Sequence, residues 1–183
     1  MADTKPQNKT MLNFEIKPYS EEFVQQAIQN FYFAYRDFTS GSDKILKEYS
    51  FGRAHHRVIY IVARNPGLTV SSLLGNLKIT KQSLNRVLGQ LIREGFVKQN
   101  PGVQDRRKRL LTLTEKGKKL ERRLTNNQYQ LIMDAFNATG ISAAKGFQRV
   151  LLNLISSEGD RQRFQKKIVP HNKIYGSIRN AHK

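Results

Sequence analysis

The stretch Thr80-Lys-Gln-Ser-Leu-Asn-Arg-Val-Leu-Gly-Gln-Leu-Ile-Arg93 decides the fold of this chain. Thr80 can cap a helix, and Gly95 follows the last apolar residue as a stop signal. Apolar residues recur at helical spacing and predict one buried stripe, formed by Leu84, Val87, Leu88, Leu91 and Ile92. The opposite face is polar and cationic, with Lys81, Gln82, Ser83, Asn85, Arg86 and Arg93. Side chains of these types reach phosphates and base edges in a DNA major groove, so we predict a reading helix.

A hairpin is expected directly after this helix, with strands at residues 96–100 and 109–113 around a tip at 101–108. Cations at such a tip can enter a minor groove, where the negative potential of DNA is strongest. Asp105 is expected to hold Arg107 by a charge-assisted hydrogen bond, so that the guanidinium points outward. The predicted DNA contacts of the hairpin are Asp105, Arg106, Arg107, Lys108 and Arg109.

A short helix within residues 68–79 precedes the reading helix and completes a helix-turn-helix. Leu73, Leu74 and Leu77 are expected to be buried, whereas Ser71 and Ser72 can meet backbone phosphates. Thr80 is counted with these serines among the predicted DNA contacts. The predicted fold class is therefore mainly α with a small β-wing, a winged helix-turn-helix.

Two further helices are expected before this lobe. Ser20 starts the first, which carries a wide apolar girdle and is broken by Gly41-Ser42-Asp43, with Asp43 capping a short turn through Ile45 and Leu46. The second spans residues 51–65 and ends at Asn65-Pro-Gly67. Its inward residues are predicted to be Ala54, Val58, Ile61 and Val62.

The adjacent histidines of the second helix, His55 and His56, invite a metal-site interpretation. Neighbouring residues on a helix point about 100° apart, and no cysteine or carboxylate cluster joins these two. A structural or ligand-lining role is therefore favoured, and neither a metal nor a cofactor is expected.

The C-terminal part is predicted to hold two apolar helices and a basic tail. Thr114 caps a helix to about residue 139, Gly140 ends it, and Ser142 caps another to about residue 157. Together with the girdle of the first helix, these helices favour a two-fold homodimer. The tail from residue 159 is interpreted as an addition to non-specific DNA affinity, ahead of a segment that orders against its own dimer.

Composition limits the partners of the chain. With 183 residues and a formal net charge of +18, it fits one domain with an anionic partner. No long apolar run or signal-peptide core is present, so a cytoplasmic protein without a membrane partner is expected. The absence of cysteine excludes disulfides and thiolate chemistry.

Several motifs extend beyond the reading helix. They are Phe33-Ala-Tyr-Arg-Asp-Phe-Thr39, Gly52-Arg-Ala-His-His-Arg57, Asn65-Pro-Gly67, Ile79-Thr-Lys-Gln-Ser-Leu84, and Asp105-x-Arg107 followed by Leu113-Thr114-x-x-Gly117. Over residues 20–158 the chain resembles the MarR family of transcription regulators, and within it an alphaproteobacterial subgroup similar to PetP and LdtR. The resemblance implies dimerisation through the N- and C-terminal helices.

The same resemblance implies a pocket for a small aromatic or phenolic effector between the dimer arms and the reading lobes. Carried over, its lining would be Phe31, Tyr35, Arg36, Thr39, His56, Ile59 and Tyr60. A packed interface explains these aromatic residues equally well.

Five segments are expected along the chain. They are an N-terminal arm (1–19), an N-terminal dimerisation helix and connection (20–50), the DNA-binding lobe (51–117), C-terminal dimerisation helices (118–158) and the basic tail (159–183). For the arm, a floppy segment and a packing of Phe14 and Ile16 across a partner subunit both stay open.

The predicted function is transcriptional regulation by a dimer on a pseudo-palindromic double-stranded DNA operator. Specificity is assigned to Gln82, Ser83, Asn85 and Arg86, whereas Lys81 and the serines mainly position the helix. The alternative is a nucleoid-associated or RNA-binding protein without operator specificity. An enzyme is not expected, because no nucleophile with a base at suitable spacing, metal cluster or phosphate-cradling glycine loop is found in the sequence.

Overall fold

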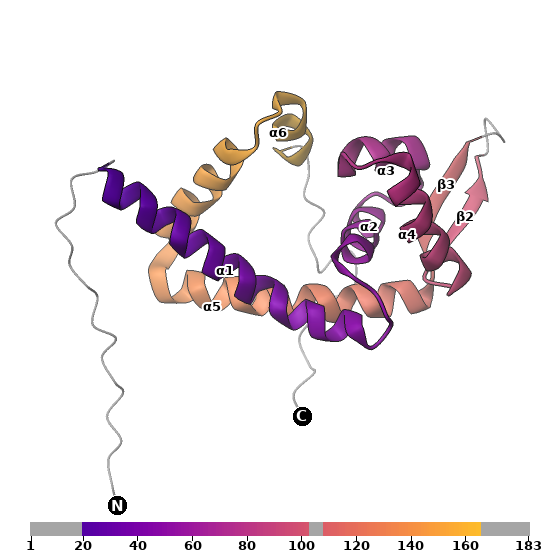
Figure 1. Cartoon of the computed structure of the whole chain (residues 1–183), viewed down its shortest axis with the longest axis horizontal. Coiled ribbons are helices and arrows are strands. Elements are labelled where there is room, and N and C mark those ends of the chain that lie inside the picture. The colour runs from indigo at the N-terminus through magenta and orange to yellow at the C-terminus, as the bar shows by residue number, and fades with distance from the viewer. Residues whose placement is uncertain (1–19, 103–107, 166–183) are drawn as a thin grey trace, which may run out of the picture. The chain divides into compact units, whose positions relative to one another are not determined.

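A computed structural model describes residues 20–102 and 108–165 of the chain (Figure 1). The chain divides into two compact units, Met1–Asp37 and Phe38–Lys183, and each is described by itself. The described part of the first unit consists of the start of helix α1 (Glu21–Lys47). Nine elements follow one another in the described chain, in the order α1, α2, β1, α3, α4, β2, β3, α5 and α6.

Helix α1 begins where the sequence predicts. The Phe23 amide donates to Ser20 Oγ at 3.2 Å, and Glu21 and Glu22 lie in the first turn, at the positive end of the helix dipole. The predicted break at Gly41 is wrong, because the helix continues to Lys47. A Cβ at Gly41 would overlap the side-chain amide of Asn127 in α5, so this glycine allows a close approach and does not end the helix.

Ser42 and Asp43, which the sequence predicts to break the helix, instead bind residues of other helices. Ser42 is buried, and its hydroxyl donates to the Leu124 carbonyl at 3.4 Å. Asp43 does not cap a new turn; its carboxylate accepts from Arg53 Nη2 at 2.7 Å. The end of α1, which belongs to the second unit, therefore contacts both α2 and α5.

The second unit holds a winged lobe. Its elements are α2 (Arg53–Arg64), β1 (Leu68–Thr69), α3 (Val70–Leu77), α4 (Lys81–Arg93), β2 (Val97–Pro101), β3 (Arg109–Leu113), α5 (Glu115–Leu154) and α6 (Glu158–Gln165). The predicted class, mainly α with a small β-wing, is confirmed. Among the described residues, no helix has the length and apolar character needed to cross a membrane.

The sheet has three antiparallel strands in the order β1-β3-β2, one more than the predicted hairpin. The wing register pairs Val97 with Leu113 and Pro101 with Arg109. The added strand β1 forms because Gly67, at φ 84°, turns the chain after α2 and its amide donates to the Leu111 carbonyl at 2.8 Å. Two residues are too short for a strand pattern to be recognised in sequence.

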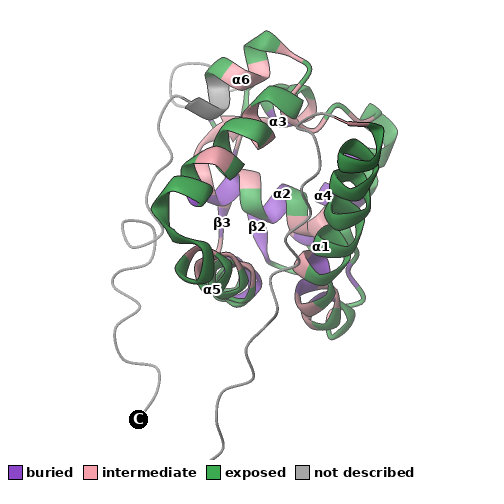
Figure 2. Ribbon diagram, turned by 90° about the vertical axis from the view of Figure 1, so that its left-hand side faces the viewer, coloured by how far each residue is buried: buried purple, intermediate pink, exposed green. Residues whose placement is uncertain are grey.

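One hydrophobic core joins the lobe helices, the sheet and the first turns of α5, and its buried residues are purple in Figure 2. The largest fully buried side chain is Phe96, between α4 and β2. The assignment of Ala54 to the core is wrong: it lies exposed in the first turn of α2, whereas Ile59 is fully buried.

The C-terminal helices meet at Gly140, as the sequence predicts. Gly140 has φ 82° and ψ 170°, which interrupts the helical geometry within α5. The tail predicted from residue 159 instead begins with helix α6, where Asp160 N donates to Ser157 Oγ and two acids lie in the first turn. The expectations for residues 1–19 and 166–183 lie outside the described residues.

Candidate nucleic-acid interface

Helix α4 has a fixed inner face and an exposed outer face. Leu84, Val87, Leu88 and Leu91 are buried in the core, which fixes the rotation of the helix about its own axis. The exposed residues include five of the predicted contacts, Lys81, Gln82, Ser83, Asn85 and Arg86. The predicted division of this helix into a core face and a polar face is thus confirmed.

The hydroxyl groups before α3 and α4 are partly used within the protein. Thr80 Oγ1 accepts from the Ser83 amide at 3.2 Å and lies 2.9 Å from the Ser83 hydroxyl. Thr69 repeats this arrangement with Ser72, at 3.1 Å to its amide and 2.9 Å to its hydroxyl. Thr80 therefore caps the helix, as predicted, while Ser71, Ser72 and Ser83 remain exposed at the surface.

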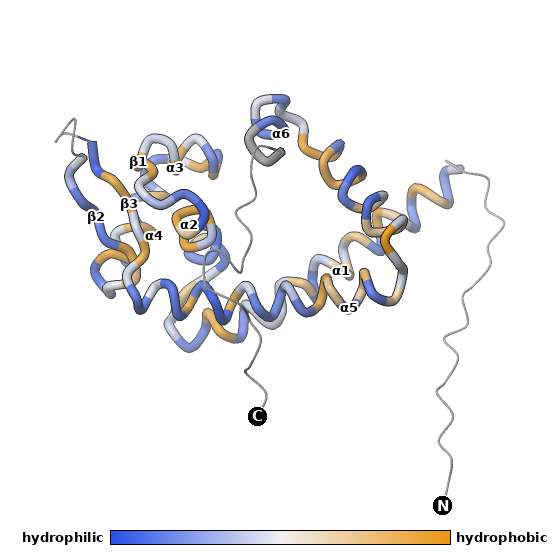
Figure 3. The backbone as a smooth tube through the Cα atoms, turned by 180° about the vertical axis from the view of Figure 1, so that it is seen from behind, coloured by the Kyte–Doolittle hydropathy of each residue, from blue (hydrophilic) through white to orange (hydrophobic). Residues whose placement is uncertain are grey.

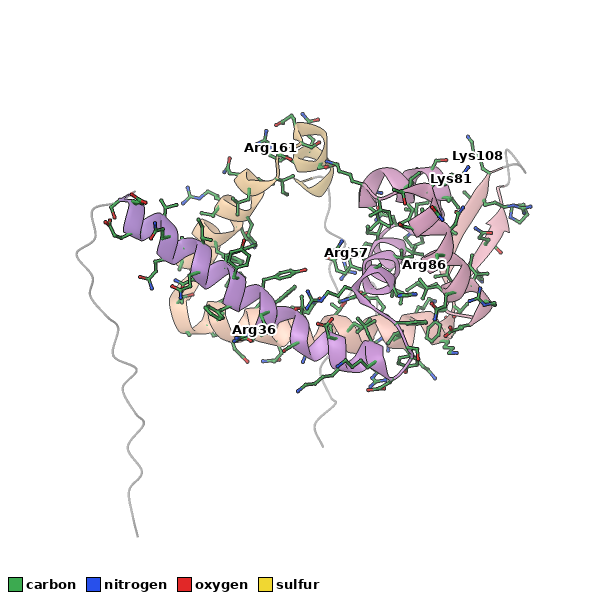
Figure 4. All side chains as sticks on the ribbon, in the orientation of Figure 1. Arg36, Arg57, Lys81, Arg86, Lys108 and Arg161 are labelled. Carbon is green, nitrogen blue, oxygen red and sulfur yellow. The ribbon has the colours of Figure 1, made fainter. Side chains whose placement is uncertain are left out.

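The wing carries cations toward its tip. Lys108 and Arg109 are exposed, and the Gly102 amide donates to the Lys108 carbonyl at 2.9 Å, which closes the described base of the tip. Lys81, Arg86 and Lys108 can be followed on the lobe in Figure 4. The predicted contacts Asp105, Arg106 and Arg107, and the pairing of Asp105 with Arg107, lie outside the described residues.

The spacing Leu113-Thr114-x-x-Gly117 forms the joint between the wing and α5. Thr114 caps α5 by accepting from the Gly117 amide at 3.1 Å, and its hydroxyl donates to the Gly95 carbonyl at 2.6 Å. Gly117 is buried, and a Cβ there would overlap the Phe96 carbonyl oxygen. The wing, the end of α4 and the start of α5 therefore form one packed joint, which holds the hairpin beside the helix.

Cations at the start of α5 have local partners. Lys116 Nζ donates to the Glu94 carbonyl at 2.9 Å and lies 4.2 Å above the Phe96 ring. Lys118 pairs with Glu115 at 2.7 Å, and Arg123 pairs with Glu48 at 2.8 Å. These contacts favour a solvated, self-paired surface at this face over a face that binds phosphates.

Sequence reasoning missed a buried ion pair between α2 and α5. Arg64 Nη1 donates to Glu121 Oε1 at 2.8 Å, and Thr125 Oγ1 donates to the same oxygen at 2.7 Å. The Glu121 side chain is 0% exposed, and the Arg64 guanidinium lies 3.4 Å above the ring of Tyr60. Within Glu-Arg-Arg the glutamate is typical of a surface charge, so its burial depends on the tertiary fold.

His56 lies near this pair and is half-buried. Burial lowers the pKa of His56 below its ordinary value of about 6.5, with Arg64 and Arg57 lowering it further and Glu121 and Asp43 opposing the shift. The folded protein therefore favours the neutral imidazole.

We expect the contribution of His56 to the free energy of unfolding to be complete above pH 6.5 and to be lost as the pH drops toward the lower pKa of folded His56. In that interval the unfolded chain takes up a proton that the folded chain refuses. Denaturant titrations at pH 7.5 and 5.5 should show a smaller loss for His56→Gln than for the wild type. Equal losses in the two proteins would rule out His56 as the source.

The residues predicted to line an effector pocket divide between the two units. In the first unit, the exposed rings of Phe31 and Tyr35 stack with centroids 6.4 Å apart, and Arg36 Nε donates to Asp37 at 2.8 Å. In the second, Thr39 is buried, His56 is half-buried and Tyr60 is 41% exposed. Ile59 is buried in the core. The pocket thus stays a prediction.

A helix-turn-helix followed by a basic hairpin defines a winged-helix DNA-binding protein. The model of the MarR family matches residues 49–108. The chain is 45% identical over 152 residues to the HTH-type transcriptional regulator PetP of Rhodobacter capsulatus, which covers 82% of this chain and 89% of that protein. The chain therefore belongs to the MarR family and is a DNA-binding transcriptional regulator.

Solved structures agree with this assignment. A MarR transcriptional regulator from Methanosarcina mazei Go1 superposes with a TM-score of 0.57 at 25% identity, over 74% of this chain and 88% of that one. The transcriptional regulator Tm0710 from Thermotoga maritima has a TM-score of 0.53 at 16% identity, over 81% of this chain and all of that one, and supports the fold alone.

Proposed function

We propose that the protein acts as a homodimer on a pseudo-palindromic operator, with α4 of each protomer in a major groove and each wing toward the adjacent minor groove. The observation that carries this proposal is the construction of α4, whose inner face is locked in the core while Gln82, Asn85 and Arg86 are exposed. Amide and guanidinium groups on a fixed helix can pair with base edges, which gives sequence preference.

The excess of positive charge around α4 favours DNA as the partner. Glu94 and Asp105 are the only acids in the sequence from Leu68 to Leu113. In this proposal, Lys81, Ser71 and Ser72 bind phosphates and set the register, and Lys108 and Arg109 extend the contact along the backbone. Thr80 caps the helix and, being exposed, stays among the proposed contacts.

Apolar side chains exposed on α1 and α5 support a dimer. On α1, in the first unit, they include Phe23, Val24, Ile28, Phe31, Tyr32 and Phe33. On α5 they include Tyr129, Leu131, Ile141, Phe147, Val150 and Leu154. Figure 3 shows hydrophobic segments along both helices. Surfaces this apolar are usually covered, and two copies related by a two-fold axis would cover both.

A dimer also meets the demands of recognition. One helix contacts too few base pairs to select a site in a genome, whereas two copies read half-sites about one helical turn apart.

Arg86→Ala should relax the preference for the operator over a mismatched duplex by about 1 to 3 kcal/mol, because a bidentate base contact is lost. Lys81→Ala, the matched control on the same helix, should weaken both duplexes equally and reduce the salt slope by about one. Binding titrations on operator and mismatched DNA measure both effects. Unchanged discrimination by Arg86→Ala would argue against base reading, and equal affinity of the wild type for operator, bulk DNA and RNA would favour the nucleoid-associated or RNA-binding alternative.

A small aromatic or phenolic effector is part of the proposal. Exposed aromatic rings that such a ligand could stack on are present in each unit taken by itself, at Phe31 and Tyr35 in the first and at Tyr60 in the second. An effector shifts the dimer only if it binds one arm spacing better than the other. Addition of a panel of phenols to the operator complex tests this, and unchanged affinity at millimolar concentrations throughout would oppose it.

A further inference from the structure

His55 and Gln90 connect the start of α2 to the last turn of α4. The Gly52 amide donates to His55 Nδ1 at 3.1 Å, and His55 Nε2 lies 3.0 Å from Gln90 Oε1. Gln90 Nε2 then donates to Glu94 Oε1 at 2.8 Å. These three hydrogen bonds form a continuous chain from the backbone of α2 to the C-cap residue of α4.

The donors and acceptors of these three hydrogen bonds match in one arrangement only. Because Nδ1 accepts from an amide, the proton of a neutral imidazole sits on Nε2 and donates to Gln90 Oε1. The amide nitrogen of Gln90 is then left to donate to Glu94.

Packing holds the imidazole in this pose. The Phe51 ring stacks on His55 with centroids 4.6 Å apart, and Phe51 in turn packs edge-on against Phe96 at 5.1 Å. The far end of the chain is held too, because the Glu94 carbonyl accepts from Lys116. The C-terminal turn of α4 is therefore tied to both α2 and α5.

The side chains proposed to read bases lie nearer to the start of α4 than Gln90 does. With a rise of about 1.5 Å per residue, the base-reading residues Gln82 and Arg86 stand about 12 Å and about 6 Å from Gln90, so a tilt of about 10° at Gln90 would move them by about 1 to 2 Å. A displacement of that size breaks paired hydrogen bonds to base edges while leaving attraction to phosphates largely intact.

We propose that His55 is a positioning residue for operator recognition, which sets the angle of α4 through Gln90. This inference rests on the proposed function, in which α4 recognises an operator, and it makes His55 the residue that orients α4 for that recognition. His55 touches no base; it acts through the helix that does.

The test uses two variants of the full chain. His55→Asn keeps a short acceptor for the Gly52 amide but cannot reach Gln90, and Gln90→Leu keeps the volume while removing both of its hydrogen bonds. Each should weaken operator binding about tenfold, the equivalent of a lost hydrogen bond. Affinity for a mismatched duplex should stay within about twofold, and the double variant should be no weaker than either single one, since both break the same chain.

The control is Gln130→Leu on α5, which removes a similar glutamine-to-acid bond, from Gln130 Nε2 to Asp134 at 2.8 Å, away from α4. It should leave both affinities unchanged, and melting curves should show all variants folded at the binding temperature. Losses that are equal on operator and mismatched DNA, or additive in the double variant, would overturn the role of His55. A wild type without operator preference would overturn operator reading itself, whereas a clear wild-type preference retained by both variants would overturn only the positioning role.

Discussion

Gly117→Ala should lower the free energy of unfolding by about 3 kcal/mol, at the upper end of the cost of overpacking a filled site. A Cβ at this position would overlap the Phe96 carbonyl oxygen, which is backbone and already accepts from the Thr114 amide at 3.1 Å. Relief requires the wing joint to open, so operator affinity should fall as well. Urea titrations monitored by circular dichroism measure the stability.

Gly75→Ala in α3 is the matched control for this prediction. A Cβ at Gly75 meets nothing within 4 Å, so alanine should raise stability by up to about 1 kcal/mol through its better helix propensity. A Gly117→Ala protein as stable as the wild type would show that the joint tolerates a side chain, and the structural reason for this glycine would be wrong.

Glu121→Ala should lower the free energy of unfolding by about 3 kcal/mol, because it leaves the largely buried Arg64 guanidinium without its carboxylate partner. This value lies at the low end for a broken buried pair, since the Arg64 side chain is 17% exposed and can turn toward water. The hydroxyl of Thr125 also loses its acceptor. Denaturant titration of the variant gives the loss directly.

Two comparisons isolate the cause. Arg123→Ala removes the exposed pair with Glu48 and should cost less than about 1 kcal/mol. The double variant Arg64→Leu with Glu121→Leu should recover most of the loss, because an apolar pair leaves no buried charge. If the double variant were less stable than Glu121→Ala alone, the volume of these side chains and not the unpaired charge would account for the effect.

Local patterns made the lobe predictable. In α4 the cap, the apolar period and the terminal glycine all agree, and the structure follows them from Lys81 to Arg93. The wing strands were predicted to within one residue. Strand β2 begins at Val97 and not at Phe96, because the Phe96 amide still donates to the Leu91 carbonyl at the end of α4.

The sequence-based predictions failed at positions whose structure depends on contacts with distant parts of the chain. Gly41 has the appearance of a helix break, yet Asn127 packs against it from α5. Glu121 sits among surface charges in sequence and is buried by the approach of α2. Likewise, the hydrogen bond between His55 and Gln90 joins residues on different helices, so periodicity could assign His55 only a structural or ligand-lining role.

Paired reading helices can be detected by methylation protection of guanine N7, a major-groove atom, on a genomic fragment that the protein selects. Two α4 helices in successive major grooves predict two clusters of protected guanines about one helical turn apart, and the Arg86→Ala variant should lose protection within both clusters. Saturating protein that leaves every guanine N7 reactive, or that protects a single cluster, would contradict reading by paired helices.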